Sequence, residues 1–337
     1  MSRKKVCILY TGGTIGMIPT ENGFAPAAGT FSAELAAIRD LSSPSMPEWD
    51  LVEFDPLLDS SNITYEQWNQ IAGEIESRYD RYDGFVVLHG TDTMAYSASA
   101  LSFMLEGLDK PVVFTGSQLP LCELRSDGND NLITSVLIAS EGKVREVCLY
   151  FCNTLLRGCR AAKTSSDGLI AFTSPNYPEL ATAGIDIEYR TKALLEHDPE
   201  SVFTVRRLRK TRLGVIKVFP GIQFDLFTPL VHDLEGLILE TFGAGNIPNY
   251  DRALSDLIEE ASAHGTIVVV CTQCQQGTVR LGTYEAGSAL VKAGAVSGFD
   301  MTTEAAVSKL AYLLSQDISH NEIKQLMRTS LRGELTI

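Results

Sequence analysis

Short apolar runs recur along the chain, and two of them end abruptly in glycine and hydroxyl residues. Val6–Tyr10 runs into Thr11-Gly12-Gly13-Thr14-Ile15-Gly16, and Gly84–Leu88 runs into His89-Gly90-Thr91-Asp92. An apolar, β-rich run that breaks in this way predicts a buried strand followed by a tight loop. Glycine permits positive φ and a close approach of ligand to backbone. The pattern therefore predicts two strand ends that each present an exposed threonine.

Strand and helix patterns alternate over most of the chain. Further strands are predicted at Asp50–Phe54, Val112–Gly116, Val147–Cys152, Val202–Val205, Val215–Phe219, Gly236–Glu240 and Thr266–Cys271. Helices are predicted at Phe31–Ile38, Thr64–Tyr79, Thr93–Leu108, Arg125–Ala139, Asp251–Ala263, Tyr284–Ala293, Thr302–Ser315 and His320–Thr329. Thr64 and Gln67 have the spacing of a capping box. Such alternation predicts parallel sheets covered by helices on both faces.

The length of 337 residues exceeds one average domain, and a polar stretch without apolar periodicity interrupts the pattern. We therefore predict two α/β domains with mainly parallel sheets: a larger N-terminal domain at residues 1–190, a linker at 191–212 and a smaller C-terminal domain at 213–337. The stretch Pro19–Gly29 is rich in glycine, proline and alanine. Its composition fits a mobile loop over Thr14 and a plain connection to the next helix equally well.

Composition narrows the class of function. The net charge of −14 argues against a nucleic-acid surface, and the short basic cluster Arg206–Arg212 is interpreted as a solvated linker segment. No window approaches a membrane span, and the apolar run Val6–Tyr10 is too short for a signal peptide, so we expect a cytoplasmic protein. The pair Cys271 and Cys274 has the spacing of half a metal site or of a redox pair, but the sequence lacks a second such pair or a histidine partner, so neither role is expected.

Three polar segments follow predicted strands and should meet at one edge of the sheet, where ligands of such sheets bind: Thr14, Asp59-Ser60-Ser61 and Thr91-Asp92. Ordinary alternatives exist. The Asp59 segment fits a turn, a helix N-cap explains Thr91 or Asp92 but not both, and Lys163 fits a solvated surface charge.

Hydroxyl, carboxylate and amine groups brought together suit acyl transfer, with backbone N–H groups at the glycine turns stabilising an oxyanion. Phosphate or nucleotide binding is the competing class, because glycine-rich loops cradle phosphates. The Thr11–Gly16 loop, however, matches neither a P-loop nor a dinucleotide fingerprint.

The two loops together resemble the signature segments of bacterial-type L-asparaginases. Thr11–Gly16 is similar to the nucleophile-threonine loop, and His89–Met94 is similar to the threonine–aspartate dyad preceded by His-Gly. The resemblance extends over nearly the whole chain, through Asp59–Ser61, Thr115–Gln118, Arg125–Gly128, Ala162–Lys163, Gly243–Asn246 and Asp300–Thr302. The start of the chain, which shows no leader pattern, is similar to the cytoplasmic, type I branch.

This resemblance implies hydrolysis of L-asparagine to L-aspartate and ammonia, without metal or cofactor. Thr14 is then the nucleophile that forms a β-aspartyl ester, and Thr91, Asp92 and Lys163 form a triad that activates a hydroxyl or the hydrolytic water. Thr91, Asp92 and the Asp59-Ser60-Ser61 segment hold the substrate's α-amino and α-carboxylate groups. The resemblance also implies a homodimer or a homotetramer arranged as a dimer of dimers.

The chain departs from the family pattern at three positions. Phe24 stands where the family has a tyrosine that hydrogen-bonds the nucleophile, so we expect reduced or differently activated turnover. Glu240 and Ala162 stand where allosteric type I enzymes use an arginine and a threonine to bind a second asparagine. An acid in place of a base repels a carboxylate, so weak or absent asparagine cooperativity is expected.

Other activities share these signatures. A glutaminase-asparaginase of relaxed specificity and a low-turnover asparagine-binding protein both remain open. The amidase subunit of a tRNA-dependent amidotransferase would need an added N-terminal domain, and we expect none ahead of Val6.

Overall fold

The computed structural model describes residues 3–21, 23–26, 29–248, 252–282 and 285–337. The chain divides into two compact units, Met1–Arg206 and Arg207–Ile337. Within the described ranges, no helix is long and apolar enough to cross a membrane. The assignment of residues 191–212 as a linker stays a prediction. That stretch contains η6 (Thr191–Ala193) and β14 (Thr204–Val205).

The first unit is built on a sheet of eight described strands in the order β13-β12-β9-β8-β7-β5-β1-β4. In that order the strands are Ile187–Tyr189, Ala181–Ala183, Thr154–Arg157, Val147–Phe151, Val112–Thr115, Gly84–Leu88, Lys5–Tyr10 and Glu48–Glu53. The five strands from β8 to β4 are parallel, and β9, β12 and β13 add antiparallel pairs at one edge. The parallel strands are short apolar runs because both of their faces are covered.

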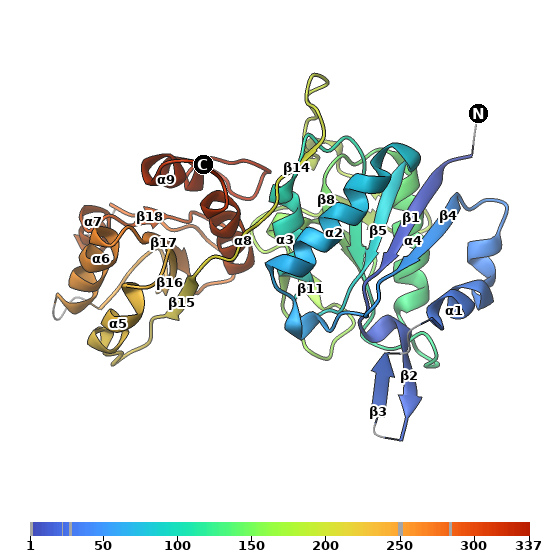
Figure 1. Ribbon diagram of the computed structural model, residues 1–337, viewed down its shortest axis with the longest axis horizontal. Helices are drawn as coiled ribbons and strands as arrows, with labels where there is room; N and C mark the ends of the chain where they lie inside the picture. Colours follow the sequence, from blue (N-terminus) through green and yellow to red (C-terminus); the bar gives the residue numbers. More distant parts are fainter. Residues whose placement is uncertain (1–2, 22, 27–28, 249–251, 283–284) are drawn as a thin grey trace. The chain divides into compact units, whose positions relative to one another are not determined.

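Helices cover both faces of this sheet (Figure 1), with α2 and α3 on one side and α4 on the other. The helices of the unit are α1 (Phe31–Ala37), α2 (Tyr65–Arg78), α3 (Met94–Met104) and α4 (Gly128–Glu141). Alternate residues of β1 pack with α1 and α4 in one continuous core. The predicted capping box at Thr64 and Gln67 is present at the start of α2.

Short two-stranded pairings complete the unit and correct two predictions. The stretch Pro19–Gly29 is no plain loop, because β2 (Met17–Thr20) and β3 (Gly23–Pro26) form a hairpin that extends away from the main sheet (Figure 1). The helix predicted to reach Leu108 ends at Met104, because Leu105–Glu106 (β6) pairs with β14. The third pair joins β10 (Ala162–Lys163) to β11 (Phe172–Thr173).

The second unit contains a parallel sheet in the order β15-β16-β17-β18. Its strands are Leu213–Lys217, Gly236–Thr241, Ile267–Thr272 and Val296–Ser297, and its helices are α5 (Thr228–Val231), α6 (Ala253–Ala263), α7 (Glu285–Lys292), α8 (Thr303–Leu314) and α9 (His320–Met327). Helix α6 packs in the core on one face, while α8 contacts β16 and β17. The predicted helix starts at Asp251 and Tyr284 lie outside the described residues. The predicted fold class, two α/β domains with mainly parallel sheets and a larger N-terminal one, is confirmed.

Candidate active site

Close backbone packing brings three loops together at the carboxyl ends of β1, β4 and β5. Gly13 has a φ of 93°, and a Cβ there would lie 2.5 Å from the backbone nitrogen of Gly90. A Cβ on Gly90 would in turn lie 2.4 Å from Oγ of Ser60. Both positions therefore require glycine, because any side chain would push the loops apart. This contact places the loop of Thr14 directly beside the loop of Thr91.

Lys163 joins the second threonine loop from β10. Its Nζ atom donates to Oγ1 of Thr91 at 2.9 Å and to Oδ1 of Asp92 at 2.8 Å. The Lys163 side chain is 19% exposed and that of Asp92 is 68% exposed, while Thr91 is buried. The interpretation of Lys163 as a solvated surface charge is therefore wrong. An amine, a hydroxyl and a carboxylate are in contact, with the carboxylate open to solvent.

The helix-cap explanation of Thr91 and Asp92 is also wrong. Helix α3 begins at Met94 with Thr93 in the N-cap position, and no side chain caps it by a hydrogen bond. The hydroxyl of Thr93 donates to the backbone oxygen of Ser60 instead, at 2.6 Å. Thr91 is less exposed than predicted. Thr14 is half-buried at the start of η1 (Thr14–Gly16), and the described residues offer its hydroxyl no hydrogen-bond partner.

The Asp59-Ser60-Ser61 segment lies on the same edge and uses part of its polarity locally. Asp59 caps η3 (Ser60–Asn62), with Oδ1 accepting from the backbone nitrogen of Ser61 at 2.9 Å. The turn interpretation of Asp59 therefore holds, although its side chain and that of Ser61 are exposed. Ser60 is buried beneath them against Gly90. The segment combines a fixed backbone with two exposed polar side chains.

A buried chain of hydrogen bonds supports the threonine loop from behind. Nδ1 of His89 lies 2.7 Å from the backbone oxygen of Gly90, and Nε2 lies 3.0 Å from Oγ of Ser97. Because a carbonyl only accepts, Nδ1 carries the proton and Nε2 accepts from Ser97, which accepts from Nε1 of Trp68 at 2.9 Å. Burial lowers the pKa of His89 to about 4, although the bond to Gly90 opposes this change. His89 is thus a neutral structural support for the peptide that precedes Thr91.

Because of His89, we expect the folded chain to lose stability in acid. The pKa of His89 is about 4 in the folded chain and 6.5 for an ordinary histidine. Between pH 6.5 and pH 4 the unfolded chain therefore binds a proton on this side chain that the folded chain does not bind, which favours unfolding. We expect His89 to cost on the order of 3 kcal/mol of stability as the pH falls from 6.5 to 4. Urea unfolding of the wild type and His89→Asn over this range checks it. The variant should be less stable at neutral pH, yet lose less on acidification. Parallel pH curves would contradict the assignment.

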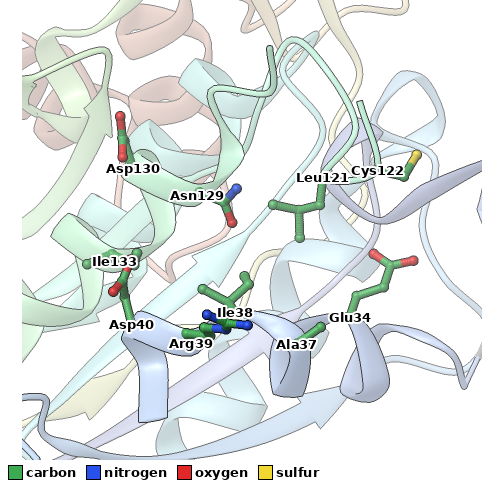
Figure 2. A pocket seen from close by; sticks show the side chains of 10 residues that line it. All are labelled: Glu34, Ala37, Ile38, Arg39, Asp40, Leu121, Cys122, Asn129, Asp130 and Ile133. Carbon is green, nitrogen blue, oxygen red and sulfur yellow. The ribbon is translucent and has the colours of Figure 1, made fainter. Parts of the chain in front are cut away.

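A cavity of about 500 Å³ lies between α1 and α4 (Figure 2). Its lining residues are Glu34, Ala37, Ile38, Arg39, Asp40, Leu121, Cys122, Asn129, Asp130 and Ile133. The backbone nitrogen of Leu121 donates to Ile15 at 3.0 Å, so one wall of the cavity supports η1. None of the seven predicted site residues lines it.

The three departures from the family pattern belong to three different strands. Phe24 is 47% exposed on the β2–β3 hairpin, opposite Pro19. Ala162 lies in β10 of the first unit. Glu240 lies in β16 of the second unit, where its carboxylate accepts from the hydroxyl of Thr303.

The sequence interpretation gave no role to Gln118 or Asp127, although both belong to segments that carried the resemblance. In the structure Gln118 contacts Thr91 directly, and the Asp127 carboxylate accepts from the backbone nitrogens of Gln118 and Leu119. The resemblance of the segments Thr115–Gln118 and Arg125–Gly128 to the family could have pointed to these two residues. The spacing of the segments in the sequence does not show that they fold against each other.

The α/β fold, with hydroxyl, amine and carboxylate groups gathered where the parallel strands of its first unit end, has the makings of an enzyme of acyl transfer. The chain belongs to the asparaginase family. Residues 5–195 match the family profile described as Asparaginase, N-terminal, and residues 212–327 match that described as Glutaminase/Asparaginase C-terminal domain.

Individual relatives agree over the full length. L-asparaginase 1 of Escherichia coli strain K12 is 46% identical over 337 residues, which cover 100% of this chain and 99% of the relative. The crystal structure of L-asparaginase I from Vibrio cholerae is 46% identical, with full coverage of both chains and a TM-score of 0.93. The thermostable L-asparaginase from Thermococcus kodakarensis is 35% identical, covers 98% of this chain and 99% of its own, and has a TM-score of 0.86. The predicted resemblance to type I asparaginases is confirmed.

Proposed function

We propose that this asparaginase hydrolyses L-asparagine through a covalent β-aspartyl intermediate on Thr14. Oγ1 of Thr14 attacks the side-chain amide carbon, the C–N bond breaks, and ammonia leaves with the proton that the hydroxyl gave up. Water then attacks the ester carbon, aspartate departs, and the proton from water returns to Oγ1 of Thr14. Backbone N–H groups of the glycine turns are suited to stabilise the oxyanion of each step.

The main support for this proposal is the contact of Lys163 with Thr91 and Asp92. The hydroxyl oxygen of Thr91 accepts a hydrogen bond from the ammonium group of Lys163 at 2.9 Å, and the loop of Thr91 packs against the loop of Thr14. We assign Thr91, Asp92 and Lys163 to proton transfer with the hydroxyl or the hydrolytic water. The exposed carboxylates of Asp92 and Asp59 suit the substrate ammonium group, because charge-assisted hydrogen bonds are strong.

Substrate preference separates two versions of this activity. The family profile of the second unit covers glutaminases as well as asparaginases. Asparagine and glutamine differ by one methylene, which a pocket discriminates by only about 1–3 kcal/mol. We favour asparagine because the three full-length relatives are named asparaginases. We also propose a homodimer or homotetramer and a cytoplasmic location.

Ammonia release across concentration series of L-asparagine and L-glutamine tests the function. We expect turnover of asparagine with a higher kcat/KM than for glutamine, and a hyperbolic velocity curve because Glu240 replaces the effector-binding base. Comparable kcat/KM values would favour the relaxed glutaminase-asparaginase. Binding of asparagine without ammonia release would favour the low-turnover asparagine-binding protein, an alternative that the replacement of the family tyrosine by Phe24 raises. A sigmoidal curve would overturn the expectation of weak cooperativity.

A further inference from the structure

Gln118 contacts Thr91 of the proposed proton-transfer group and the backbone of the hairpin that carries Lys163. Its Oε1 atom lies 3.2 Å from Oγ1 of Thr91, and its Nε2 atom lies 3.2 Å from the backbone oxygen of Ser166 and 3.1 Å from that of Gly168. Residues 164–171 connect β10, which carries Lys163, to β11. One half-buried amide therefore links the threonine loop to the hairpin of the lysine.

The chemistry of these contacts fixes the direction of each hydrogen bond. The two backbone oxygens only accept, so the nitrogen of the Gln118 amide must face them and its oxygen must face Thr91. That oxygen accepts the hydroxyl proton of Thr91. The ammonium group of Lys163 has donors only, so it donates to one lone pair of the same hydroxyl oxygen. Thr91 thus keeps one lone pair for a further donor, such as water or the hydroxyl of Thr14.

The turn that carries Gln118 is itself held rigidly. The Asp127 carboxylate accepts from the backbone nitrogen of Gln118 at 3.0 and 3.1 Å and from that of Leu119 at 3.1 Å. The hydroxyl of Ser126 donates to the backbone oxygen of Leu119 at 3.0 Å, and Nδ2 of Asn131 donates to Asp127. The Arg125–Gly128 segment therefore shapes the turn that aims Gln118.

We propose that Gln118 is a positioning residue of the asparaginase reaction, which holds the Thr91 hydroxyl in the orientation that makes it a proton acceptor. The proposal rests on the proposed function of Thr91 and Lys163. It gives a single role to two sequence segments, Thr115–Gln118 and Arg125–Gly128. Gln118 acts through Thr91.

Two substitutions separate its oxygen from its nitrogen. Gln118→Met removes both polar groups at similar size, whereas Gln118→Glu keeps an acceptor for Thr91 and loses the donor to Ser166 and Gly168. We expect Gln118→Met to lower kcat for asparagine by about 10- to 100-fold with KM changed less than about 3-fold, because its contacts are with Thr91 and the hairpin. Gln118→Glu should retain a larger kcat than Gln118→Met. Leu124→Ala, at a fully exposed side chain on the adjacent loop, is the control for nonspecific effects.

Equal kcat values for wild type and Gln118→Met would overturn the proposal, as would a loss that appears in KM alone or an equal loss in the two Gln118 variants. Absence of ammonia release by the wild type would show that the proposed function itself is wrong, and it would leave the role of Gln118 to a second test. In that case neutron diffraction of wild type and Gln118→Met provides the test, because it shows the hydroxyl hydrogen of Thr91. The proposal requires this hydrogen to point at Oε1 of Gln118 in the wild type and to take another direction in the variant, and an unchanged direction overturns it.

Discussion

Replacing Thr14 with alanine is expected to lower kcat for L-asparagine by at least about 10⁴-fold, because removal of a nucleophile abolishes the covalent route. Binding of aspartate or asparagine should persist, since the groups assigned to the substrate's charged ends belong to the Asp59-Ser60-Ser61 segment, Thr91 and Asp92. Ammonia release gives the rate. Isothermal titration gives the affinity, with a change in Kd of less than about 10-fold expected.

Thr14→Ser is the matched control, because it restores a hydroxyl at the same position without the methyl group. It should retain turnover well above that of the alanine variant. Intact-mass measurement after rapid acid quenching should detect an aspartyl adduct on wild type and none on Thr14→Ala. An alanine variant within about 10-fold of wild type would show that another group attacks the amide. Loss of asparagine and aspartate binding in Thr14→Ala would instead assign Thr14 to substrate recognition.

Local signals explain what could be predicted of the fold. The capping box at Thr64 and Gln67 is complete within four residues, and α2 begins directly after Thr64. The buried strands are short apolar runs with glycine at their ends, so β1 and β5 lie within one residue of their predicted positions. Non-local pairing explains the failures. Leu105 continues the apolar spacing of α3, but its backbone pairs with Val205, about 100 residues away.

The residues of the candidate site also divide into those that local patterns could predict and those that depend on contacts between distant parts of the chain. Strand ends placed the Thr14, Asp59 and Thr91 segments at one edge, since parallel strands share that edge. Lys163 is a lone lysine after alanine in the sequence, and only the β10–β11 hairpin brings it to Thr91, 72 positions away. The role of Gln118 likewise depends on a carboxylate 9 positions further along the chain. Residue spacing does not encode such contacts, so only the family resemblance pointed to Lys163.

Breaking the ion pair between Lys309 and Glu334 is expected to cause the largest loss of stability that a single conservative substitution produces in the second unit. Both side chains are fully buried, and Nζ of Lys309 lies 2.5 Å from Oε1 of Glu334. Lys309 also donates to the backbone oxygens of Met327 and Thr329. The Glu334 carboxylate accepts from the backbone nitrogens of Leu331 and Arg332. The pair therefore ties the C-terminal segment to α8.

Glu334→Gln keeps the shape of the side chain and an acceptor for the backbone but leaves the Lys309 ammonium buried without a counter-charge. Breaking one side of a buried pair costs about 3–5 kcal/mol, so the urea midpoint of the second unit should fall accordingly. Lys309→Met should cost a similar amount because the carboxylate is then unpaired. The double variant removes both charges and should be less destabilised than the sum of the single variants. Additive losses, or a change of less than about 1 kcal/mol in Glu334→Gln, would show that the backbone contacts of each side chain carry the stability and the ion pair does not.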